Sequence, residues 1–197
     1  MGLGMCCEEA AHLILNFEDD FELVPFEMDE DFTMTEDEEQ AVFLRDEVFE
    51  ILNDRDTGIL NRFCKLSHKF GLDFLKLDKD EICSKYLSFE RLDDKWTVML
   101  KDIKNTDINF SVFDKPKLET AFRQLACYFI FRHFADGMWD DSFSGRVKFA
   151  LTACFLIGAL LEKDNIYTVK QMEEYARMLS SEVEYSDINI EKAFEVL

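Results

Sequence analysis

Two adjacent cysteines and a Glu-x-x-His pair stand near the start of the chain, within GLGMCCEEAAHLIL (residues 2–15). Thiolates are the usual ligands of iron–sulfur clusters, but a cluster needs three or four of them. Neighbouring helical residues point about 100° apart, so Cys6 and Cys7 would rarely both bind one cluster as simple ligands. The pair is therefore either packed on an ordinary helix or part of a site whose other ligands lie elsewhere. Adjacent cysteines also lack the C-x-x-C spacing of thiol oxidoreductases, which disfavours a redox role.

Glu9 and His12 have the i, i+3 spacing that places a carboxylate and an imidazole on one helical face, as in metal-binding helix bundles. Such a site needs matching motifs from other helices, and neither His68 nor His133 follows a carboxylate by three or four residues. We therefore expect a surface or interface pair rather than a metal site. The remaining cysteines lie in apolar helical stretches, where buried and inert thiols are expected: Cys64, Cys83, Cys127 and Cys154.

The composition indicates a globular and mainly helical protein. Hydrophobic residues make up 48% of the 197 residues, and there are 20 Phe but only 2 Pro and 7 Gly. Folds with many strands need more turn residues than this. The sequence has no phosphate-binding loop, nucleophile elbow or βαβ pattern, which disfavours the common kinase, dehydrogenase and methyltransferase folds. Trp96, Trp139 and the many Phe side chains are expected in the core rather than on a stacking platform.

The negative charge is concentrated in one segment. The net charge is −20, and residues 18–39 contain 12 acidic side chains and no Lys or Arg. Such a field repels phosphate backbones, so nucleic acid is not expected as a partner. The segment is either a solvated loop that aids solubility or a surface that attracts a lysine-rich protein.

We expect a soluble cytoplasmic protein without a membrane segment. No basic region follows Met1, and the most apolar stretch, residues 149–161, is shorter than a membrane span. All six cysteines are then expected to be reduced.

The hydrophobic spacing predicts an all-α fold, a single multi-helix orthogonal bundle over residues 1–197. We divide it into a motif helix at 1–17, the acidic segment at 18–39 and a helical body at 40–197, with at most one short strand at 21–26, around Pro25. Thr35 and Glu38 form a capping-box pattern that begins a helix ending near Asn53. Further helices are expected at 57–70, 79–89, 93–104, 116–134, 141–163, 168–179 and 186–197. Residues 105–115 are expected to form a polar surface loop, and the helix at 141–163 to lie in the core.

Five stretches, spread in order over nearly the whole chain, carry a resemblance to one protein family. They are GLGMCCEEAAHLIL (2–15), LRDEVFEILNDR (44–55), LSFERLDDKW (87–96), YFIFRH (128–133) and SSEVEYS (180–186). Together they resemble the C-terminal portion of the flagellin lysine-N-methylase family. The Cys-Cys-Glu and Glu-Arg-Leu-Asp-x-Lys-Trp stretches are the most specific parts of the resemblance.

The resemblance implies transfer of a methyl group from S-adenosylmethionine to lysine ε-amino groups of flagellin, in the cytoplasm. It also implies an iron–sulfur cluster, held in family members by a cysteine-rich region upstream of the Cys-Cys pair. Cys6 and Cys7 would then be metal ligands, although those upstream cysteines are not in this sequence. We therefore expect a truncated member that does not hold a cluster by itself. The alternative is a non-catalytic helical interaction module whose acidic segment binds a basic partner.

Overall fold

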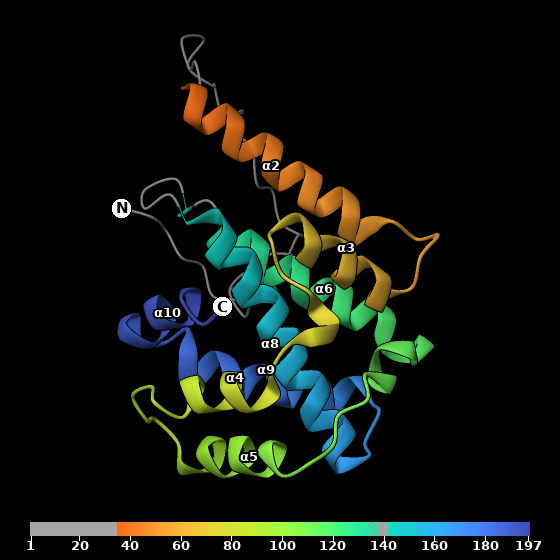
Figure 1. Ribbon diagram of the computed structural model, residues 1–197, viewed down its shortest axis with the longest axis vertical. Helices are drawn as coiled ribbons and strands as arrows, with labels where there is room; N and C mark the ends of the chain where they lie inside the picture. The colour runs from red at the N-terminus through yellow and green to blue at the C-terminus, as the bar shows by residue number, and fades with distance from the viewer. Residues whose placement is uncertain (1–34, 135, 138–141) are drawn as a thin grey trace, which may run out of the picture. The chain divides into compact units, whose positions relative to one another are not determined.

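The computed structural model describes residues 35–134, 136–137 and 142–197, and these residues form a bundle of helices without a strand among them (Figure 1). The prediction of an all-α fold is confirmed. Residues 35–197 form one compact unit. The motif helix, the possible strand at 21–26, Cys6 and Cys7, the Glu9 and His12 pair, and most of the acidic segment lie outside the described residues.

The helices begin close to the predicted positions, whereas α9 ends four residues later than predicted and α4 and α10 each end three residues earlier. The α-helices are α2 (Glu36–Asn53), α3 (Ile59–Lys69), α4 (Lys79–Tyr86), α5 (Asp94–Lys104), α6 (Pro116–His133), α8 (Phe143–Asp164), α9 (Val169–Val183) and α10 (Asp187–Phe194), and two short 3-10 helices are η1 (Phe74–Lys76) and η2 (Ser111–Asp114). The predicted capping box is present, since Glu38 N donates to Thr35 Oγ1 at 3.3 Å and Thr35 N donates to Glu38 Oε2 at 2.7 Å. Residues 36–39 of the acidic segment are therefore the first turn of α2.

Helix α8 lies in the middle of the bundle, with α4 and α5 side by side at one end (Figure 1). Every residue from 149 to 161 is buried. By length and composition alone α8 could cross a membrane, and 83% of its most apolar window is buried inside the bundle. An apolar surface all round a helix must be covered on all sides, and α3, α5, α6, α9, α10 and η2 each pack on it. The prediction that this helix forms the core is confirmed.

The connection between α5 and α6 differs from the predicted polar surface loop. Val112 and Phe113, in η2, are buried. Glu162 of α8 accepts hydrogen bonds from the backbone N–H groups of Asn109 and Val112, each at 2.9 Å. Phe110 takes a left-handed backbone conformation with φ 62° just before η2. The prediction was wrong here because so short an apolar run has no readable periodicity.

Phe113 belongs to a cluster of aromatic rings that joins η2 to the core. Its ring centroid lies 4.6 Å from that of Phe122, 5.5 Å from that of Phe74 and 5.7 Å from that of Phe63. On α8, the ring faces Gly158, where an added Cβ would lie 2.8 Å from Phe113 Cζ. A glycine at this position therefore allows η2 to approach α8 closely.

We expect Gly158→Ala to lower the free energy of unfolding by about 1–3 kcal/mol, because overpacking outweighs the better helix propensity of alanine. Urea unfolding measures the change. Gly58→Ala is the matched control, since nothing lies within 4 Å of a Cβ there, and it should shift stability by less than about 1 kcal/mol. Equal effects of the two substitutions would contradict the close packing of η2 on α8.

Candidate functional site

Three of the five stretches singled out in the sequence meet at the C-terminal end of α9. Residues 87–96 form the connection between α4 and α5 and the first turn of α5, and residues 128–133 are the last residues of α6. Residues 180–186 complete α9 and lead into α10. Glu182 contacts the first of these stretches, and Glu184 contacts the second. The stretch at 44–55 lies mainly in α2, which packs on α3 and α6.

Asn189 and Glu182 fasten the α4–α5 connection to the C-terminal helices. The Asn189 side chain is fully buried, and its Nδ2 donates to the carbonyl oxygens of Glu90 and Glu182 at 2.8 Å and 2.7 Å. Its Oδ1 accepts from Glu90 N at 2.7 Å. Leu92 N donates to Glu182 Oε2 at 3.1 Å. Backbone groups at 90 and 92, outside any helix, therefore find their partners on α9 and α10.

Glu184 is the centre of a second buried cluster. Its side chain is 1% exposed, and its Oε1 lies 2.9 Å from Arg132 Nε and 2.7 Å from His133 Nε2. The Tyr128 hydroxyl donates to Oε2 at 3.3 Å. Burial alone raises the pKa of Glu184, but hydrogen bonds from His133 and Ser180 and the charge of Arg132 hold this pKa below its ordinary value. His133 thus has a carboxylate partner, although no carboxylate precedes it by three or four residues in the sequence.

Glu182 has the opposite electrostatic environment. Burial raises its pKa, and the backbone N–H groups of Leu92 and Asp93 offset this only in part. The residue is 4% exposed, yet its Oε1 has no hydrogen-bond partner among the described residues. The buried hydroxyl of Tyr86 likewise has none within the described part of the chain. Both side chains line one small pocket of about 10 Å³.

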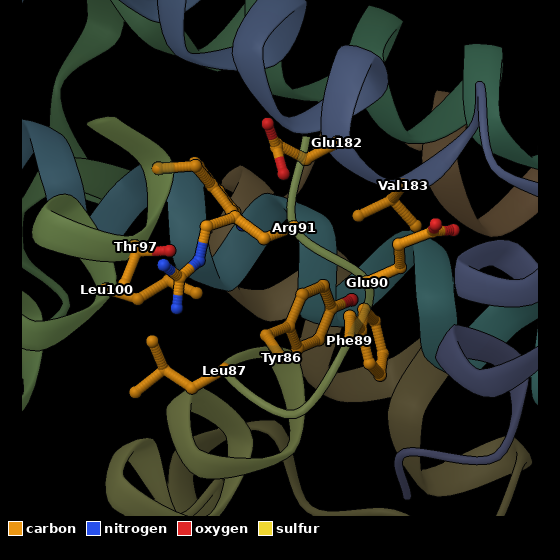
Figure 2. A pocket seen from close by; sticks show the side chains of 10 residues that line it. Tyr86, Leu87, Phe89, Glu90, Arg91, Thr97, Leu100, Glu182 and Val183 are labelled. Carbon is orange, nitrogen blue, oxygen red and sulfur yellow. The ribbon is translucent and has the colours of Figure 1, made fainter. Parts of the chain in front are cut away.

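Figure 2 shows how the walls of this pocket are arranged. Glu182 and Val183 face it from α9, and Tyr86 lies on the other side at the end of α4. The backbone that carries Glu90 and Arg91 passes between them. The pocket is therefore formed where α4, α5 and the connection between them meet α9, and not within a single helical hairpin.

A larger pocket of about 130 Å³ adjoins the first, and Trp96 and Glu182 line both. Its other lining residues are Asp93, Lys95, Glu174, Arg177, Met178 and Ser181. Arg177 Nη2 binds Glu174 Oε1 at 2.6 Å. The prediction that Trp96 is a core residue is confirmed, since it is 4% exposed, and its ring also forms a wall of both pockets. Trp139 lies outside the described residues.

The cysteines of the described part do not fit an iron–sulfur cluster. Cys83 and Cys154 are buried, as predicted, whereas Cys64 and Cys127 are half-buried. Burial raises the pKa of all four thiols, that of Cys83 to about 11, and clusters bind thiolates. Among the described residues, no group of three or more His, Cys, Asp or Glu side chains is placed to hold a metal ion. The prediction that Cys6 and Cys7 are metal ligands concerns residues outside this part and stays a prediction.

Comparison of the chain with protein-family models, with curated proteins and with solved structures gave no match. Sequence reasoning did not single out Glu182, Glu184 or Asn189 as individual residues. The available signal was that two of them lie in a stretch, residues 180–186, that carries the family resemblance.

We expect Asn189→Ala to lower the free energy of unfolding by about 2–4 kcal/mol, because it leaves the backbone groups of Glu90 and Glu182 without partners. Urea unfolding measures the loss, and amide hydrogen exchange at Glu90 should speed up more than elsewhere in the bundle. Glu191→Ala, an exposed change in the same helix, should stay within about 0.5 kcal/mol of wild type. If both variants are equally stable, Asn189 does not hold the connection.

Glu184→Gln should reduce stability in a pH-dependent way. The folded-state pKa of Glu184 is depressed, so its ionised form stabilises the fold above the unfolded-state pKa of about 4.3, and this contribution is lost as pH falls through the lower folded value. We expect a loss of about 1–3 kcal/mol near pH 7 that shrinks toward zero below about pH 4, measured by urea unfolding over a pH series.

The control for this experiment is Glu173→Gln, an exposed change on the same helix, which should follow wild type at every pH. A stability difference between Glu184→Gln and wild type that stays constant with pH would show that charge at residue 184 is not what stabilises the cluster.

Proposed function

We propose that the chain is the helical, substrate-binding body of a protein-lysine N-methyltransferase of the flagellin lysine-N-methylase type. In this proposal it acts in the cytoplasm, with S-adenosylmethionine as methyl donor, on flagellin or another lysine-rich protein. The observation that carries the proposal is the convergence of three stretches with the family resemblance, residues 87–96, 128–133 and 180–186, on one turn at the end of α9.

The contacts at this turn are polar and buried, which supports a site more than packing alone. The buried groups are the side chains of Asn189, Glu182 and Glu184, which bind the Glu90 backbone, Leu92 N and His133 respectively. Buried polar groups destabilise the folded state unless they are paired. Apolar side chains of similar size would fill the same space in the bundle without this desolvation cost. Polar clusters of this kind concentrate at functional sites, where stability and activity compete.

The size of the pockets indicates which of the two substrates, the methyl donor or the target lysine, they would bind. A nucleoside cofactor needs a pocket of about 300–1,000 Å³ to enclose it. Neither pocket at Trp96 reaches this size, and the larger is about 130 Å³. The residues here do not fit the whole methyl donor. We assign to them the lysine side of the reaction, and a lysine side chain is long, narrow and basic.

Deletion of the gene in the organism that encodes it should remove methyl-lysine from a flagellin or another lysine-rich protein, detected by mass spectrometry of tryptic peptides. Restoring the gene should restore the methyl groups, and the purified natural polypeptide should transfer label from methyl-labelled S-adenosylmethionine to the unmethylated protein. An unchanged methyl-lysine profile after deletion would contradict the proposal. If the profile is unchanged while the chain binds flagellin and salt releases it, the chain is instead a non-catalytic interaction module.

A further inference from the structure

We propose that the two adjoining pockets at Trp96 and Glu182 form a binding site for a primary alkylammonium group, the end of a lysine side chain. The choice of lysine rests on the proposed function, and the preference for an alkylammonium rests on the geometry alone. The site comprises the side chains of Tyr86, Trp96, Met178 and Glu182.

Glu182 provides the hydrogen-bond acceptor. It is nine-tenths buried, one carboxylate oxygen accepts from Leu92 N, and the other has no partner among the described residues. A buried carboxylate oxygen left without a donor is unfavourable, so a ligand that supplies a donor gains affinity there. Two arginines that border the pockets are bonded to other acids, Arg177 to Glu174 and Arg91 to Asp94. Neither of these two contacts involves Glu182.

Aromatic rings provide the remaining attraction. Trp96 is almost fully buried and lines both pockets, and Tyr86 and Phe89 line the smaller one with ring centroids 4.8 Å apart. Ring faces attract cations, and most strongly where water is excluded. The buried Tyr86 hydroxyl, which has no hydrogen-bond partner among the described residues, is a second acceptor that lines the smaller pocket, on the other side of the Glu90–Arg91 backbone from Glu182 (Figure 2). An ammonium has three N–H donors and no acceptor, which matches a site with unpaired acceptors.

The volumes fit the end of a lysine side chain. The smaller pocket has room for about one water-sized group, whereas a dry cavity of about 150 Å³ holds a benzene ring. The larger pocket, about 130 Å³, therefore accommodates a four-carbon stem beside Trp96 and Met178. Three carboxylates line it (Asp93, Glu174 and Glu182) against two basic side chains (Lys95 and Arg177). An anionic ligand would face the larger number of like charges, so a cation is favoured.

The test is a titration of the full chain with n-butylammonium, with n-butanol and butyrate as neutral and anionic matches of the same length. Trp139→Phe leaves Trp96 as the single tryptophan, so fluorescence reports on the site, and isothermal titration calorimetry provides a second measurement. We expect saturable binding of butylammonium and none of butanol or butyrate in the same range. A lysine-containing peptide should compete with butylammonium.

Glu182→Gln keeps the shape of the side chain and removes its charge, and it should weaken butylammonium binding about tenfold or more. Glu173→Gln, on the exposed side of the same helix, should leave binding unchanged. Lys95→Gln removes one of the two basic side chains that line the larger pocket and should leave binding equal or tighter. If Glu182→Gln does not fold, Tyr86→Phe takes its place and should weaken binding about threefold or more.

The proposal is overturned if butylammonium does not saturate, if butanol or butyrate binds as well, or if neither Glu182→Gln nor Tyr86→Phe changes the affinity. These outcomes are independent of the methyl-lysine profile of the deletion strain. A chain that is needed for methylation but does not bind amines at Trp96 would retain the proposed function and lose this subsite. A chain that binds amines without any effect on methylation would retain the subsite and lose the function.

Discussion

The burial of α8 on every side is the constraint on which the rest of the structure depends. A helix of 22 residues with an apolar centre can be removed from water only if other helices surround it. Helices α6 and α9 both pack on α8 and also contact each other. Their C-terminal ends thereby come together, which places Arg132 and His133 of α6 against Glu184. The candidate site is thus a consequence of how the core is covered.

Glu182 and Glu184 differ in electrostatic environment because the end of α9 lies between α6 and the α4–α5 connection. Side chains at i and i+2 point to different sides of a helix. Glu184 points to α6 and meets an arginine, a histidine and a tyrosine, which compensate its burial. Glu182 points to the α4–α5 connection and meets two backbone N–H groups, which satisfy only part of its carboxylate. A compensated charge stabilises the fold, and an incompletely compensated one keeps binding capacity for a ligand.

The negative charge of the chain would favour a basic partner in two ways, through the net charge at long range and through the carboxylates of the pocket at contact. A net charge of −20 attracts lysine-rich proteins over a distance of about a Debye length, and salt weakens this attraction. In the proposed amine site, selectivity would depend on desolvated contacts, which salt weakens much less. Association with a basic protein and selection of one ammonium group would then have different salt dependences.

The sequence by itself determined the all-α class, the central helix and the helix starts at Thr35 and Thr168, because these follow from periodicity and from hydrogen bonds that span three residues. Only the tertiary structure decided that residues 112–113 are buried, that His133 meets Glu184, and that Asn189 binds Glu90. The two partners in the last pair are 99 residues apart, and their meeting depends on which helices are neighbours. Local spacing has no information about such pairs, since many arrangements of the same helices would satisfy it equally well.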